Sequence, residues 1–141
     1  MARIRYEPAP DVEEDARYIV ERLGMEWIDL SRVGFVRSRG SRSGAVARIW
    51  GLPRAFQEAF GLEPLYVVEV ISERYDRLTR RERLRVLIHE LLHIPRSFSG
   101  GLRSHGRLVN ERVVEEMYRR LLVDEADRHV EGGGGHHVRE G

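Results

Sequence analysis

Two histidines and a glutamate near the middle of the chain have the spacing of a metal site. His89, Glu90 and His93 form the pattern H-E-x-x-H. Residues four positions apart lie on the same face of an α-helix, so the two imidazoles can point at one metal ion. Glu90 follows His89 directly, where its carboxylate can take a proton from a water bound to that ion. The spacing predicts a zinc (Zn2+) site with Glu90 as the catalytic base.

The flanking residues predict the helix that this spacing requires. Thr79 and Glu82 have the spacing of a capping box, in which each side chain accepts a hydrogen bond from the other residue's backbone N–H. Pro95 is expected to end the helix, because proline cannot continue the hydrogen-bond ladder. Apolar residues recur at helical spacing between these ends and predict one buried stripe: Leu84, Leu87, Ile88, Leu91 and Leu92.

A third metal ligand is needed, since a catalytic zinc usually has three protein ligands and one open position. The chain has no cysteine, which leaves His, Asp and Glu as ligands. His105 is the first candidate, because residues 94–104 include proline and glycine and can turn the chain back toward the helix. Glu115 or Glu116, on the last predicted helix, could take this place instead.

The remaining patterns predict one α+β domain at residues 1–127 and a flexible Gly/His tail at 128–141. Hydrophobic residues make up 41% and charged residues 33% of the 141-residue chain, which is typical of a globular domain. Helices are predicted at residues 11–23, 52–60 and 107–127, the first capped by Asp11. Strands are predicted at 33–37, 45–50 and 65–71. His136 and His137 in the tail could bind metal adventitiously, although a flexible segment has no preset geometry.

Two segments could bind a partner. Residues 38–44 combine arginine, serine and glycine and, with Arg37 beside them, could contact phosphate or single-stranded nucleic acid, although a solvated hairpin loop is the simpler interpretation. The strand at 65–71 could bind an extended peptide if it lies at a sheet edge. Its nearly continuous apolar run favours a buried strand instead.

Charge and hydropathy exclude some classes of protein. The net charge is +1, which gives no general attraction to polyanions. No apolar run has the length of a membrane span, and the first residues lack the apolar core of a signal peptide. We therefore expect a cytoplasmic protein with no membrane partner.

The motif at His89–His93, followed by His105 and Gly106, resembles the zincin metallopeptidases. More narrowly, it resembles the putative phage metallopeptidase family and the related SprT-like proteases, which share H-E-L-x-H, a glycine-bearing loop and a third histidine often followed by glycine. The resemblance extends over about residues 11–122. It implies a zincin-like fold with a small, mostly antiparallel sheet, zinc on the three histidines, and hydrolysis of a peptide or protein substrate with Glu90 as general base.

The chain also departs from the pattern of these families. Ser99 occupies the position at which metzincins carry their third histidine, which excludes that group. The loop before His105 is shorter than in the DNA-repair members, so their substrate is not carried over. A zinc hydrolase of a non-peptide substrate, a structural metal with a fourth protein ligand, and a nucleic-acid-binding module remain as alternatives. Arg103, Tyr75 and Tyr118 are candidates for stabilising the transition state.

Overall fold

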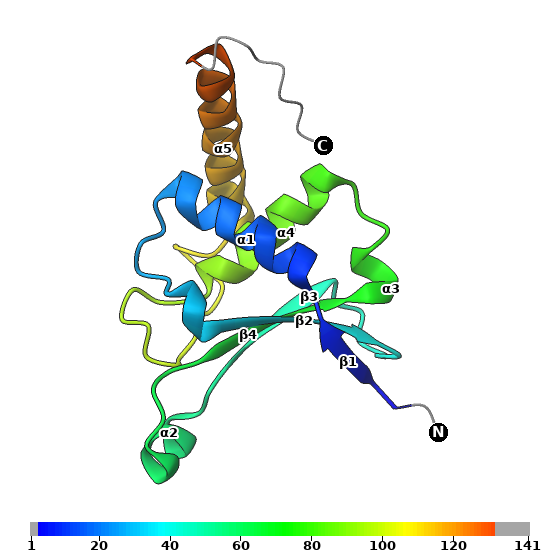
Figure 1. Ribbon diagram of the computed structural model, residues 1–141, viewed down its shortest axis with the longest axis vertical. Helices are drawn as coiled ribbons and strands as arrows, with labels where there is room; N and C mark the ends of the chain where they lie inside the picture. Colours follow the sequence, from blue (N-terminus) through cyan, green and yellow to red (C-terminus); the bar gives the residue numbers. More distant parts are fainter. Residues whose placement is uncertain (1–2, 132–141) are drawn as a thin grey trace.

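The computed structural model describes residues 3–131 and consists of one sheet with helices (Figure 1). The strands are β1 (Arg5–Pro8), β2 (Val33–Arg39), β3 (Ala47–Gly51) and β4 (Tyr66–Ile71). The helices are α1 (Pro10–Leu23), the short 3-10 turn η1 (Leu30–Arg32), α2 (Arg54–Phe60), α3 (Ser72–Tyr75), α4 (Arg80–Leu92) and α5 (Glu111–Glu131). The predicted α+β class is confirmed.

The strands form one mixed sheet in the order β1-β2-β4-β3. The β1–β2 and β3–β4 pairs are antiparallel and the β2–β4 pair is parallel, so the sheet is mostly antiparallel, as predicted. The predicted hairpin between β2 and β3 is wrong, because β4 lies between these two strands. The central position of β4 explains its apolar run and rules out β4 as an edge strand. The two edge strands of the sheet are β1 and β3, and β3 is the one next to β4.

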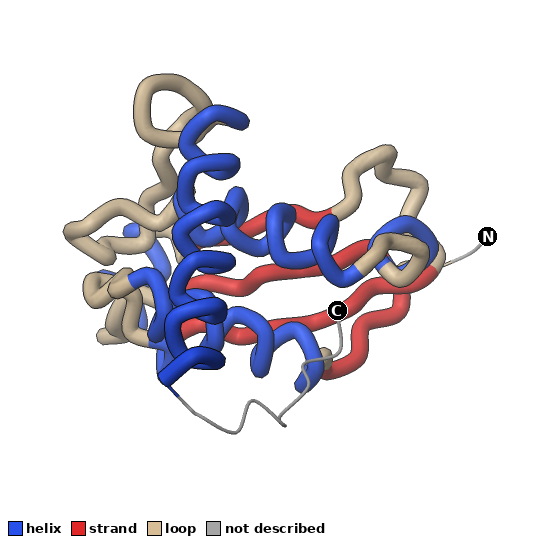
Figure 2. Tube along the Cα trace, turned by 90° about the horizontal axis from the view of Figure 1, so that it is seen from above, coloured by secondary structure: helices blue, strands red, loops and turns tan. Residues whose placement is uncertain are grey.

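The core lies between one face of the sheet and helices α1, α4 and α5 (Figures 1 and 2). The amphipathic stripes of α1 and α4 point into it, as their spacing predicts. Its fully buried side chains include Val12, Ala16, Ile19, Val68, Val70, Leu87, Ile88 and Leu91. No helix within residues 3–131 has both the length and the apolar character to cross a membrane.

Three helices begin at other positions than predicted, and α2 begins at Arg54 instead of residue 52. Helix α1 begins at Pro10, its N-cap residue is Ala9, and no side chain caps it, so the predicted capping by Asp11 is wrong. Helix α5 begins at Glu111 instead of residue 107, because the Asn110 side chain accepts a hydrogen bond from the Val113 N–H at 2.9 Å. Helix α5 continues to Glu131, past the expected start of the tail at residue 128. The Gly/His segment at 132–141, with both tail histidines, lies outside the described residues.

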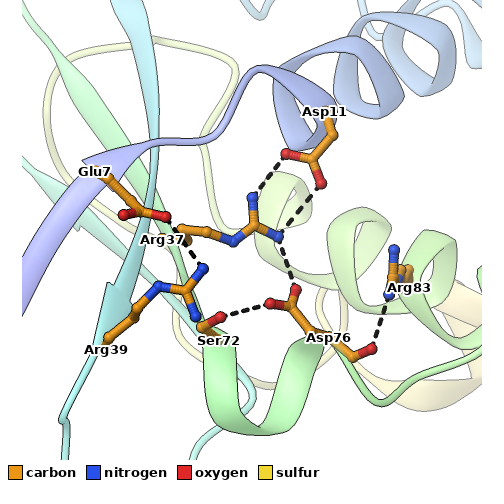
Figure 3. Close-up of polar contacts among 7 residues, drawn as sticks. All are labelled: Glu7, Asp11, Arg37, Arg39, Ser72, Asp76 and Arg83. Atoms are coloured by element: carbon orange, nitrogen blue, oxygen red, sulfur yellow. Dashed lines mark hydrogen bonds and ion pairs between the residues drawn. The ribbon is translucent and has the colours of Figure 1, made fainter.

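A half-buried arginine on β2 joins the start of α1 to the end of α3 (Figure 3). The Arg37 side chain is only 12% exposed and donates hydrogen bonds to Asp11 at 2.8 Å and to Asp76 at 2.7 Å. These bonds, chiefly the one to Asp11, raise the pKa of Arg37. Arg39 pairs with Glu7 on β1 at 3.1 Å. Two of the arginines that could contact nucleic acid are therefore already paired with carboxylates.

A buried carboxylate attaches edge strand β3 to the sheet. Glu69 on β4 is 0% exposed and accepts hydrogen bonds from Arg48 Nε at 3.0 Å and Trp50 Nε1 at 2.9 Å. Burial alone would raise the pKa of Glu69, but the hydrogen bonds outweigh burial and the pKa is lowered. An ionised Glu69 thus fixes β3, the strand that borders the candidate site.

Candidate metal centre

Helix α4 positions His89 and Glu90, and both of its ends are defined locally. Thr79 is the N-cap: its Oγ1 accepts from the Glu82 N–H at 3.2 Å, and its own N–H donates to the Glu82 carboxylate at 2.9 Å. The predicted capping box is therefore confirmed. The helix ends at Leu92, and His93 is its C-cap residue.

Contacts at both ends hold α4 in place. Arg80 in its first turn pairs with Asp15 of α1 at 2.6 Å. Beyond its last turn, the Trp27 indole donates to the Ile94 carbonyl at 2.9 Å. The apolar stripe between these contacts is buried, as predicted. The helix is thus a rigid support, which a metal site needs if its ligands are to keep their positions.

The loop from His93 to His105 is held against the sheet by Tyr66. This tyrosine on β4 is 1% exposed, and its hydroxyl accepts from the Gly100 N–H at 2.7 Å and donates to the Gly101 carbonyl at 2.8 Å. Gln57 of α2 donates to the Ser99 carbonyl at 3.1 Å. These bonds direct the chain back over the C-terminal end of α4, which brings His105 to the other two histidines.

Two glycines allow this close approach. A Cβ atom on Gly51 would lie 2.0 Å from the Gly100 carbonyl oxygen, so a side chain at position 51 would displace the loop. Gly100 has a φ of +99°, which side-chain-bearing residues rarely adopt. Gly100, one of the glycines expected to turn the loop, therefore also forms the close contact between the loop and Gly51 of β3.

The three histidines converge on one point. Their ligand nitrogens all lie within 4.8 Å of one another, and no Asp or Glu of the described residues joins this group. The Nε2 atoms of His89 and His105 are 2.9 Å apart. Tetrahedral zinc bonded at about 2.0–2.1 Å would separate its nitrogens by about 3.3 Å, so small side-chain shifts would suffice to hold the ion. The donor set predicted from the sequence fits a metal.

Hydrogen bonds fix the orientation of His93. Its Nδ1 lies 2.6 Å from the Arg103 carbonyl oxygen, and its own carbonyl accepts from the Arg103 N–H at 2.7 Å. A carbonyl oxygen can only accept, so the imidazole proton is on Nδ1. The lone pair of Nε2 is then available to a metal, which is the usual arrangement for histidine ligands.

Burial adjusts the protonation of the other two motif residues. It lowers the pKa of His89, with a further decrease from neighbouring His93 and His105, and so favours the neutral imidazole that can bind a metal. Burial raises the pKa of Glu90 to about 7 in the metal-free chain. Glu90 borders the cavity at the histidines but is not one of the converging ligands. A carboxyl group with this pKa suits proton transfer at neutral pH.

The alternative ligands are engaged elsewhere. Glu115 forms ion pairs with Arg85 and with Arg119, the latter at 3.1 Å, and Glu116 lies 3.6 Å from Arg112. Neither glutamate belongs to the converging group.

Of the candidates for transition-state stabilisation, only Arg103 lines the cavity of about 480 Å³ at the histidines. Tyr75 is buried on α3, and the Tyr118 ring lies beneath the guanidinium groups of Arg81 and Arg85. The functions of Tyr66 and Gln57 were not predicted, because strand and helix propensities do not reveal which distant loop a side chain will contact.

Removing the Tyr66 hydroxyl should weaken metal binding without unfolding the protein. Tyr66→Phe keeps the ring but loses both bonds to the loop that carries His105, so zinc affinity should fall about tenfold, as for other supporting residues of metal sites. Tyr75→Phe is a matched control, since the Tyr75 hydroxyl is buried without a hydrogen-bond partner among the described residues. Zinc titration of both apoproteins measures the effect. Equal affinities in the two variants would contradict a positioning role for Tyr66.

The fold and the histidine cluster together define a small α+β domain with a candidate metal site: His89 lies on α4, His93 is the C-cap residue of α4, and His105 lies on the following loop. The model of the putative phage metallopeptidase family matches residues 4–130, and the chain belongs to this family. No curated protein and no solved structure matches the chain.

Proposed function

We propose that this family member is a zinc-dependent peptidase, with the metal on His89, His93 and His105 and with Glu90 as general base. The observation that carries the proposal is the convergence of three imidazoles beside a carboxylate that stays outside the ligand group. Three nitrogen donors without thiolates suit zinc. Three ligands also leave one position open, which favours a catalytic over a structural metal.

The metal and Glu90 have different roles in the proposed reaction. When bound, zinc would polarise the carbonyl of the scissile bond and lower the pKa of a water molecule. Glu90 takes the proton from the attacking water and then donates it to the nitrogen of the leaving amine. The half-buried position of Glu90 supports this role, because its elevated pKa brings the two protonation states close in free energy.

Edge strand β3 supports a peptide as the substrate. The Val46 carbonyl accepts from the Ile71 N–H, and the Leu52 N–H donates to the Leu65 carbonyl, both at 2.9 Å. By the alternation of an antiparallel pair, Ala47 and Ile49 direct their N–H and C=O groups away from β4. Both residues line the cavity at the histidines. An extended peptide can pair with these groups and bring one of its bonds to Glu90.

A cleavage screen tests the proposal. The zinc-loaded protein is incubated with unfolded proteins and mixed peptides, and new amino termini are identified by mass spectrometry. We expect cleavage that a chelator abolishes and that added zinc restores. Cleavage that persists with the chelator would contradict the proposed mechanism.

A further inference from the structure

A second cavity adjoins the metal centre. It has a volume of about 420 Å³ and shares Ala47, His89 and Glu90 with the cavity at the histidines. The remaining lining residues come from the position before β3, from α4 and from the first turn of α5: Val46, Glu82, Arg85, Val86, Glu111 and Val114. We call this cavity the side pocket. A peptide paired with β3 would pass its entrance, since Ala47 borders both cavities.

The walls of the side pocket combine apolar surface with negative charge. Val46, Val86 and Val114 supply the apolar part. Glu82 and Glu111 also line the pocket, and both residues are exposed, so that their carboxylates can meet an entering side chain. A pocket that combines apolar walls with carboxylates suits a side chain with a long aliphatic stem and a cationic head.

The one cation in the lining is already neutralised. Arg85 forms an ion pair with Glu115, and its guanidinium lies over the Tyr118 ring at 5.3 Å from the centroid. Glu111 forms no ion pair or side-chain hydrogen bond with any described residue, although its charge acts on His89 and opposes the lowering of the His89 pKa. Among residues 3–131, the Glu82 carboxylate accepts hydrogen bonds only from Thr79, which carries no charge. The pocket therefore has an excess of negative charge that a cationic ligand would balance.

We infer that the side pocket binds a lysine or arginine side chain of the substrate next to the cleaved bond, with Glu111 as the main determinant of this preference. The inference rests on the proposed peptidase function and adds a substrate class to it. The stem would pack on the three valines, and the ammonium or guanidinium group would reach the carboxylates of Glu111 and Glu82. Each cut should then have the basic residue on the same side of the broken bond.

Matched peptides test the preference. They differ at one position next to the cleaved bond, which carries lysine, norleucine or glutamate; norleucine keeps the apolar stem of lysine without its charge. We expect kcat/KM to decrease in the order lysine, norleucine, glutamate, with lysine about five- to tenfold above norleucine, as one well-placed ion pair gives. Glu111→Gln should remove most of the lysine preference, and Glu111→Lys should place glutamate above lysine. Glu116→Gln is the matched control, because Glu116 is an exposed residue of the same helix outside the pocket.

A binding measurement separates this inference from the proposed function. The same peptides, fluorescently labelled, are titrated into zinc-loaded Glu90→Gln protein with and without Glu111→Gln. Tighter binding of the lysine peptide that depends on Glu111 supports the pocket even if the parent protein cleaves none of the peptides. Equal binding of the lysine and norleucine peptides, or a lysine preference that survives Glu111→Gln, overturns the inference even if cleavage is observed.

Discussion

Replacing Glu90 by glutamine is expected to lower turnover by roughly 10²–10⁴-fold, the range typical of general acid–base catalysis. The amide keeps the size of the carboxyl group and part of its hydrogen bonding but cannot take a proton from water. Glu90 is outside the group of converging nitrogens, so zinc affinity should equal that of the parent. Thermal stability should not fall below that of the parent, because burial disfavours the charged form of Glu90 and the amide is neutral. A large loss of kcat at unchanged metal content would mark Glu90 as the base.

The control for this experiment is Glu116→Gln, which makes the same chemical change on the exposed surface of α5. This variant should cleave at the parental rate. Undiminished, chelator-sensitive cleavage by Glu90→Gln would refute the mechanism even if zinc binding is confirmed. A Glu90→Gln protein that also loses zinc would instead indicate that Glu90 contributes to the metal site.

Replacing His105 by alanine is expected to weaken zinc binding by more than roughly a hundredfold, since even outer partners of a metal site contribute about 10–100-fold. His105 is exposed, so the metal-free variant should unfold at nearly the parental temperature. The stabilisation that added zinc gives the parent should shrink with the affinity, because a ligand stabilises only the state that binds it. Zinc titration and thermal unfolding with and without zinc measure both effects.

Two comparisons make the His105 result specific. Glu115→Ala and Glu116→Ala remove the alternative ligands and should retain tight zinc binding, although Glu115→Ala also breaks the ion pair with Arg85. All variants should carry alanine at positions 136 and 137, so that tail histidines cannot hold the ion. Tight zinc binding in His105→Ala together with its loss in Glu115→Ala would move the third ligand to α5.

Local signals explain which parts of the structure were predictable. The ends of α4 depend on Thr79, Glu82 and nearby Pro95, all within one stretch of chain, and the structure has the helix where this stretch predicts it. The four-residue spacing of His89 and His93 likewise follows from helix geometry alone. The loop composition indicated that the chain could turn back toward α4, but it did not indicate the Tyr66 and Gln57 contacts that place His105.

Nonlocal contacts explain what the sequence did not reveal. The reversal at residues 38–44 was predicted, but nothing within it shows that β4 would lie between β2 and β3. Strand β1 was missed because all four of its residues are exposed, so it has no alternating pattern. The Tyr66 contacts and the side pocket join segments far apart in the chain, and the H-E-x-x-H motif carries no information about either.

The number and kind of ligands around bound zinc test the central claim most directly. X-ray absorption of the zinc-loaded protein, with alanine at positions 136 and 137, reports both. We expect one zinc per chain with three imidazole nitrogens at about 2.0–2.1 Å and one further light atom from solvent. A zinc ion with four protein ligands would indicate a structural metal, and a protein that binds no zinc would contradict the metal centre itself.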